Sequence, residues 1–177
     1  KFNNFQKFIY NKSINQIKNN SKLQITGSGS SDELMQISNM TYPSKNITNY
    51  KHNYGDYGFN SNFENNKDGY SYKKSSLENN GAFLTIDKSI NKNLSLFSTK
   101  IHELLLRVRK SNGIVYIYSR YIHSGIIPLI LALEQNGYSK YNSPSVLNLP
   151  EWDSQKSPYK KNEPISFNGE LISDFRK

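Results

Sequence analysis

The aliphatic residues of this chain concentrate in residues 113–138, GIVYIYSRYIHSGIIPLILALEQNGY. The stretch opens with a continuous apolar run, residues 114–118, which is rich in β-branched and aromatic side chains and is flanked by Gly113 and Ser119. Such a run is typical of a strand that is buried on both faces in a mainly parallel sheet. The sequence therefore predicts one central strand here, and this strand constrains the fold more than any other feature.

A helix is predicted on each side of this strand. Apolar residues precede the strand at helical spacing: Ile101, Leu104, Leu105 and Val108. Basic residues fill the last turn of that helix, where they suit the negative end of the helix dipole. After the strand, residues 126–133 are predicted to form an apolar helix with Pro128 in its first turn and Gly137 as a left-handed cap. The order helix, strand, loop, helix indicates an α/β fold.

The loop over residues 119–125 follows the carboxyl end of the predicted strand, which is where ligands bind in open α/β sheets. Its hydroxyl residues and the amino end of the next helix offer hydrogen-bond donors to a phosphate oxygen. Arg120 and His123 add charge or further hydrogen bonds. A purely structural interpretation stays open, in which Ser119 ends the strand, Ser124 caps the helix and Arg120 is solvated.

The composition limits the size of the hydrophobic core, but it does not identify a binding partner. Hydrophobic residues make up 35% of the 177 residues, so the core is expected to be small and local. The formal net charge of +9 attracts polyanions such as nucleic acid or an anionic membrane surface. The basic residues occur singly, so a solubilising role is equally open. Cysteine is absent and His52, His102 and His123 are scattered, so neither a disulfide nor a spaced metal motif is predicted.

Two further helices are predicted near the beginning of the sequence. Residues 2–17 carry apolar side chains at helical spacing, and the pattern ends at residues 19–21. After a flexible Gly- and Ser-rich stretch, Ser30 and Glu33 have the spacing of a capping box for a short helix through residue 37. The acidic pair Asp32-Glu33 is interpreted as the start of this helix.

The middle and the end of the chain show no sustained period. Residues 44–80 are predicted to form a long surface loop or a partly disordered insertion. Within it, NYGDYGF at residues 53–59 is interpreted as a loop pinned by buried Tyr or Phe, with base stacking as the alternative. Residues 142–177 are predicted to be a loop-rich connection to a strand over 164–171.

A longer stretch resembles a known family. The sequence SNGIVYIYSRYIHSGIIPLILALEQNGYSKY, preceded by FSTKIHELLLRV, resembles the opening of the second RecA-like domain in superfamily 2 helicases of large nucleocytoplasmic DNA viruses. This group includes poxvirus-type early transcription factor subunits and related transcription helicases. FQKFIYNKSINQIKNN and LMQISNMTYPS are similar to the end of the first RecA-like domain, and YGDYGF resembles the insert between the two domains. Thr99 stands where the family pattern has Pro.

The resemblance implies a fragment of an α/β, P-loop NTPase type helicase that spans two partial domains. Residues 1–43 would be the helical end of the first RecA-like domain, residues 44–97 a low-complexity insertion, and residues 98–177 the start of the second domain. The parent protein is then expected to be an ATP-dependent helicase or translocase, a hydrolase that acts on DNA or RNA in viral transcription, with RNA polymerase as a possible partner.

The family also assigns roles to the loop after the strand. It is similar to helicase motif IV, which contacts nucleic-acid backbone phosphates, so the resemblance implies these nucleic-acid contacts: Tyr118, Ser119, Arg120, His123, Ser124 and Gly125. None of them is expected to be catalytic, and no metal ligand is expected. The sequence contains no GxxxxGK[ST] motif, so ATP and Mg²⁺ are expected to bind the parent protein and not this fragment alone.

Two other kinds of function compete with the helicase fragment. The charge and the aromatic loops also suit a non-enzymatic nucleic-acid-binding module, and a degenerate helicase-like protein used as a scaffold is a third interpretation. The sequence has neither an apolar stretch of about 18 residues nor a signal-peptide layout. A soluble intracellular protein without a membrane partner is therefore expected, located in the virion or the host cytoplasm if it is viral.

Overall fold

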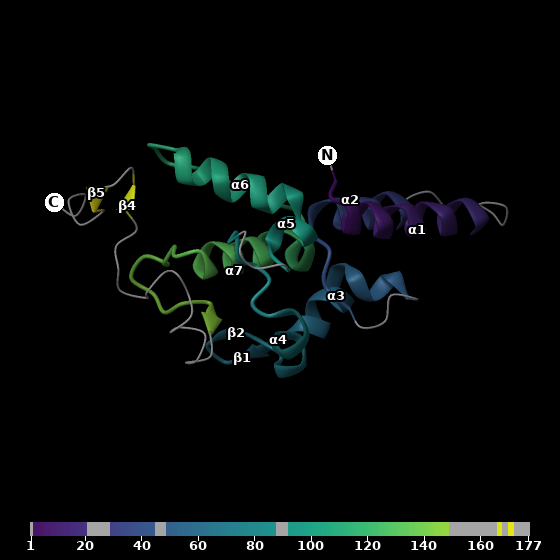
Figure 1. Ribbon diagram of the computed structural model, residues 1–177, viewed down its shortest axis with the longest axis horizontal. Coiled ribbons are helices and arrows are strands. Elements are labelled where there is room, and N and C mark those ends of the chain that lie inside the picture. Colours follow the sequence, from purple (N-terminus) through teal and green to yellow (C-terminus); the bar gives the residue numbers. More distant parts are fainter. Residues whose placement is uncertain are drawn as a thin grey trace.

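The computed structural model describes residues 2–20, 29–44, 49–87, 92–148, 166–167 and 170–171. Its elements follow one another along the chain (Figure 1): α1 (Asn4–Asn20), α2 (Gly29–Asn39), η1 (Tyr50–Asn53), α3 (Gly55–Asn62), β1 (Phe63–Asn66), β2 (Gly69–Tyr72), α4 (Lys74–Asn80), α5 (Leu94–Phe97), α6 (Thr99–Lys110), η2 (Ile122–Ile126), α7 (Ile127–Gln135), β3 (Leu147–Asn148), β4 (Ser166–Phe167) and β5 (Glu170–Leu171). The described residues therefore form a mixed fold of helices and short strands.

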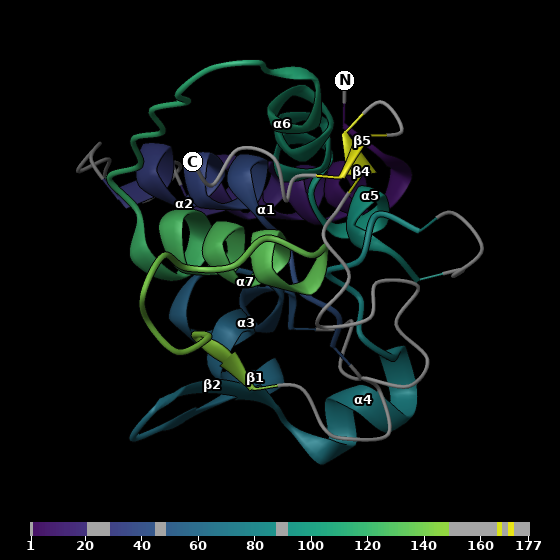
Figure 2. The same cartoon turned by 90° about the vertical axis from the view of Figure 1, so that its left-hand side faces the viewer.

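The two helices predicted near the beginning of the chain are confirmed as α1 and α2, which lie side by side (Figures 1 and 2). Their shared face buries Ile9 and Ile37 together with Tyr50 of η1. Polar groups add to the contact, because the Ser13 hydroxyl donates to Glu33 Oε1 over 2.6 Å. Asp32 lies in the first turn of α2, as expected, whereas the side chain of Ser30 and the flexible stretch before the helix lie outside the described residues.

Residues 44–80 differ from the loop that was predicted. Where the structure describes them, they form η1, α3, the β1–β2 hairpin and α4. Packing of aromatic rings explains why this segment is structured. Phe59, Phe63 and Tyr72 are buried, and the rings of Phe59 and Phe63 stack with their centroids 5.0 Å apart. The sequence pattern missed them because few aliphatic residues occur here and the rings follow no single period. NYGDYGF is mostly helix α3, with Phe59 as its buried anchor.

Both helices predicted around the central strand are confirmed, as α6 and α7. Ser98 begins α6, because its hydroxyl accepts a hydrogen bond from the Ile101 N–H over 2.9 Å. Pro128 lies in the first turn of α7, and Gly137 follows the helix with a positive φ of 96°. Helix α7 occupies the middle of the molecule, between α6 and the sheet (Figures 1 and 2).

The sheet of the described core is small and mixed. Strands β1 and β2 pair antiparallel through a tight turn, and β2 pairs in parallel with β3 in the order β1-β2-β3. One apolar core joins this sheet to the helices, with buried residues from Met40 through Phe83 to Leu147. An α/β fold is therefore present, while the RecA-like sheet and the domain boundaries at 43 and 97 stay predictions.

The predicted buried strand over residues 114–118 is wrong for the described chain. The segment is extended but belongs to no sheet, and it runs as an open arc from α6 to η2 (Figure 2). Ile114 is fully exposed and Tyr116 is 87% exposed, while Ile117 alone in the segment packs against the core. Within the described part of the chain, residues 114–118 donate and accept no backbone hydrogen bond. A strand needs a neighbour, and the described residues supply none.

The end of the chain is described only at β4 and β5. These two short strands pair antiparallel, with Ser166 opposite Leu171, where a single strand over 164–171 was predicted. The remainder of residues 149–177 lies outside the described residues. Among the helices that are described, none has the length and hydrophobicity that crossing a bilayer requires.

Candidate nucleic-acid interface

The loop that precedes α7 is tied to the first turn of α2 by one carboxylate. Arg120 Nη2 and the Tyr121 hydroxyl both donate to Asp32 Oδ1, each over 3.0 Å. The guanidinium also lies over the Tyr121 ring, 5.1 Å from its centroid. The Arg120 side chain remains 64% exposed, so this ion pair orients the cation without hiding it from solvent. The interpretation of Arg120 as simply solvated is therefore incomplete.

Ser124 anchors the loop from inside. It is buried, and its hydroxyl accepts from the Gly55 N–H at the start of α3 over 2.9 Å. The same hydroxyl donates to Gln36 Oε1 of α2 over 3.4 Å. Ser124 therefore holds two helices and does not act as a simple N-cap. The chain enters α7 through the π-helical turn η2, closed by the Ile126 N–H donating to the Tyr121 carbonyl over 2.9 Å.

Gly125 allows the loop to close tightly on itself. A Cβ atom at this position would lie 2.1 Å from Ser119 Oγ and 3.1 Å from Ser119 Cβ. Ser119 in turn donates to the Tyr121 carbonyl and accepts from the Tyr121 N–H, both over 3.2 Å. Gly125 is needed for this close approach of the backbone, so both residues shape the loop that carries Arg120.

His123 has a different place from the other predicted contact residues. Its ring stacks on Phe59 with the centroids 4.6 Å apart, and its Nδ1 lies 2.8 Å from Asp56 Oδ1. The buried Tyr42 hydroxyl donates to the His123 carbonyl. The side chain therefore packs against α3, and it does not line the cavity formed by the rest of the loop. We infer that His123 stabilises the loop and does not contact a ligand in the cavity.

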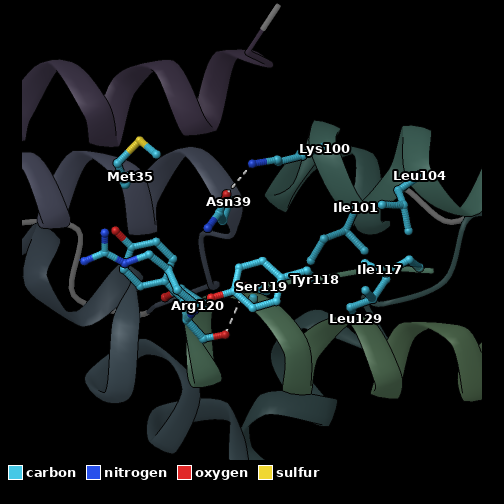
Figure 3. Close-up of a pocket in the computed structure, with 13 residues that line it drawn as sticks. Met35, Asn39, Lys100, Ile101, Leu104, Ile117, Tyr118, Ser119, Arg120 and Leu129 are labelled. Atoms are coloured by element: carbon cyan, nitrogen blue, oxygen red, sulfur yellow. Dashed lines mark hydrogen bonds between the residues drawn. The ribbon is translucent and has the colours of Figure 1, made fainter.

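The other five predicted residues line one cavity of about 250 Å³ between α2, α6, the 117–125 segment and α7 (Figure 3). These five are Tyr118, Ser119, Arg120, Ser124 and Gly125. The apolar walls come from other parts of the chain: Met35, Ile101, Leu104, Ile117 and Leu129. The cavity thus joins an apolar interior to the hydroxyls and the cation that the sequence had singled out.

Three lining residues were not predicted from the sequence: Asn39, Lys100 and Tyr121. Lys100 Nζ donates to Asn39 Oδ1 over 2.6 Å, which places a second cation beside the cavity. No sequence signal connects these residues to the loop, because Asn39 is the last residue of α2 and Lys100 lies in the first turn of α6. Only the packing of α2 against α6 brings them to Tyr118 (Figure 3).

The lining offers positive charge, hydrogen-bond donors and aromatic surface. Burial, together with the hydrogen bond to Asp32, raises the pKa of Tyr121, so its hydroxyl stays neutral and remains a donor. Lys100 and Arg120 supply the charge, and the 77% exposed Tyr118 supplies the ring. Among the described residues, no three His, Asp or Glu side chains gather where they can hold a metal ion. The chemistry of these lining groups is suited to binding an anion with an aromatic part.

Comparison with known proteins gives no relative from which a function can be transferred. No protein-family model, no curated protein and no solved structure matches the chain. The class that the structure defines is a mixed α/β protein with a cation-lined cavity at the loop before α7.

Proposed function

We propose that the loop over residues 118–125 is a nucleic-acid contact of an ATP-driven helicase or translocase that acts in viral transcription. One observation carries the proposal: Tyr118, Arg120 and Lys100 line a single cavity beside a loop that is held by α2 and α3. Cations bind backbone phosphates and an exposed ring stacks on a base, which is how proteins hold single strands. The net charge of +9 favours the same polyanionic partner.

The helicase part of the proposal rests on the resemblance of residues 97–141 to the second RecA-like domain. The order of α6, an extended apolar segment and α7 supports it, because a RecA-like domain uses that order around a parallel strand. In this proposal residues 114–118 become a sheet strand when neighbouring strands of the parent protein pair with them. The partners are then DNA or RNA and a transcription complex.

ATP and Mg²⁺ are assigned to the parent protein. The residues of this chain do not fit an ATP site, because the sequence has no GxxxxGK[ST] loop to cradle the phosphates. Its own contribution is to bind and orient the nucleic acid through Arg120, Lys100 and the ring of Tyr118. No step of nucleotide hydrolysis is assigned to these residues.

The test is binding of a fluorescent single-stranded oligonucleotide over a range of salt concentrations. Arg120→Ala is expected to lower the affinity about fivefold at about 0.1 M salt and to reduce the salt slope by about 0.7, the value for one lost phosphate contact. The matched control is Lys67→Ala, which removes the same charge from the exposed turn between β1 and β2. Equal losses for both variants would mean that only net charge matters, and the loop would not be the contact.

A further inference from the structure

One polar side chain that lines the cavity has an unused hydrogen-bond donor. Asn39 is only 8% exposed, and its Oδ1 accepts from Lys100. Among the described residues, no partner accepts a hydrogen bond from its Nδ2. In Figure 3 this nitrogen points away from Lys100, toward the side of the cavity where Tyr118 and Arg120 lie. Asn53 Oδ1 is the one polar side-chain atom of the described residues that is fully buried without a partner, so Asn39 Nδ2 is still open to solvent in the cavity, where an acceptor atom of a ligand can replace water.

The shape of the cavity limits what can enter it. Its volume of about 250 Å³ is below the roughly 300–1,000 Å³ of pockets for drug-sized ligands, so one planar ring system fits better than a larger molecule. Ile101, Leu104 and Leu129 form apolar walls, which suit the faces of such a ring. The ring needs an acceptor atom on its edge to use Asn39 Nδ2.

The charges at the same cavity indicate what the ring is attached to. Lys100 and Arg120 belong to its lining, and the Arg120 side chain is mostly exposed. A nucleobase has two apolar faces, acceptor atoms on its edge and a phosphate on each side of its sugar. A nucleotide can therefore contact the apolar walls, the Asn39 donor and the two cations at once. An uncharged aromatic ligand would offer no negative charge to the two cations.

We infer that this cavity receives one unstacked base of a single nucleic-acid strand, with Tyr118 stacking beside it and Asn39 Nδ2 donating to its edge. The inference rests on the proposed function and adds the substrate class, a single strand. In a duplex the base is paired and stacked, and extracting it has a free-energy cost that is smallest in a single strand. The cations then hold the phosphates that flank the inserted base.

The experiment compares two fluorescent strands with the same number of phosphates, an oligothymidylate and an abasic strand, in binding to the 177-residue chain. The base-bearing strand is expected to bind roughly tenfold more tightly, because stacking one base contributes substantially to affinity. A second strand with 2-aminopurine at one position is expected to change its emission on binding. A duplex of the same length is expected to show weaker binding than the oligothymidylate.

Two variants remove the base site in different ways. Leu104→Trp fills the cavity, and Asn39→Asp keeps the shape and the acceptor for Lys100 but removes the donor. Leu104→Trp is expected to bring the affinity ratio of oligothymidylate to abasic strand close to one, and Asn39→Asp is expected to lower that ratio severalfold, because a carboxylate cannot donate to the base edge. Because that ratio cancels the effect of net charge, Asn39→Asp remains informative if Leu104→Trp does not fold.

The outcomes separate the two proposals. If the wild-type chain binds both strands equally, the base site is overturned while the phosphate contact of the loop stands. If neither strand binds, the proposed function fails and the base site fails with it. A ratio near ten that survives in Asn39→Asp, in a folded variant, overturns the role of the Asn39 donor.

Discussion

The residues that shape the candidate site are joined to one another by hydrogen bonds. Asp32 receives hydrogen bonds from both Arg120 and Tyr121, and Ser124 joins α2 to α3 through its hydroxyl. This arrangement requires glycine at position 125, because a Cβ atom there would overlap Ser119 Oγ. At the residue scale, short polar contacts therefore hold the loop around Gly125, which has no side chain.

A Gly125→Ala substitution tests this contact. The added methyl group meets Ser119 Oγ, so we expect a loss of about 1–3 kcal/mol of unfolding free energy, measured by urea denaturation. Ser119→Ala combined with Gly125→Ala is expected to recover part of that loss. Gly113→Ala is the matched control, since no atom lies within 4 Å of its added Cβ. An equal loss in the control would mean that chain entropy, not the contact, is responsible.

Helix α7 contacts two separate segments through the polar residues at its carboxyl end. Gln135 Nε2 donates to the Ala82 carbonyl over 2.5 Å, and Asn136 accepts from the Ile86 N–H over 2.9 Å. Glu134 accepts from the Val146 and Leu147 N–H groups over 3.0 and 2.6 Å. At the element scale, the run Glu-Gln-Asn positions β3 and the 82–86 segment against the helix, which keeps the sheet beside the core.

Removal of the Glu134 carboxylate is expected to release β3. The Glu134→Ala variant leaves two backbone N–H groups without their charged acceptor, which predicts a loss of about 2 kcal/mol in unfolding free energy. Hydrogen exchange at Val146 and Leu147 is expected to accelerate, while exchange within α7 changes less. Glu103→Ala, an exposed glutamate on α6, serves as the control and is expected to change stability by less than about 0.5 kcal/mol. Unchanged exchange at β3 would contradict the role of Glu134.

The whole molecule combines one aromatic-rich core with an apolar segment outside it. Sixteen buried residues from 40 to 147 form a single cluster, yet residues 114–118 extend away from that cluster except at Ile117. An extended segment with unpaired backbone N–H and C=O groups and exposed apolar side chains is a template for pairing with another chain. The packed part of the fold, by contrast, buries Tyr42, Tyr50 and Tyr72.

Lysine substitutions distinguish the exposed from the packed side chains of this segment. We expect Ile114→Lys combined with Tyr116→Lys to leave the thermal midpoint nearly unchanged and to reduce self-association measured by light scattering. Ile117→Lys is expected to lower stability by about 1–3 kcal/mol, because it places a charge against the core. A comparable loss in the first variant would show that its side chains are buried in solution.

Alkaline pH is expected to weaken the fold through its tyrosines. Burial, reinforced by the Glu33 carboxylate, raises the pKa of Tyr50 to about 12, and burial also raises the pKa values of Tyr42 and Tyr54. An unfolded tyrosine ionises near 10, so the folded chain holds more protons above that pH. The stability from the neutral tyrosines is complete below about pH 10 and is lost as the pH rises toward 12.

The measurement is the urea midpoint between pH 9 and 12, compared with that of Tyr50→Phe. The urea midpoint of the variant is expected to decline less steeply with pH, because its folded state holds roughly one fewer extra proton than that of the wild type. Tyr116→Phe, at an exposed position, is the control and is expected to decline as the wild type does. Parallel curves for the wild type and Tyr50→Phe would exclude Tyr50 as the group that titrates.

The helices could be predicted because a single local pattern determines each of them. Apolar spacing predicted α1 and α6, the Ser30–Glu33 spacing predicted α2, and a continuous apolar run bounded by Pro128 and Gly137 predicted α7. The segment over 44–80 could not be predicted in this way, because its order comes from aromatic rings that meet one another across α3 and the hairpin. Of the six predicted contact residues, five line the cavity and His123 does not.

The sequence by itself determined the amphipathic helices, since each depends on neighbours within a few residues, and the basic net charge, which follows from composition. Tertiary structure alone decided which apolar run is buried. Residues 114–118 have the composition of a central strand, but a strand forms only where another backbone supplies hydrogen bonds. The cavity has the same origin, because Asn39, Lys100 and Tyr118 are distant in the chain and meet only through the packing of α2, α6 and α7.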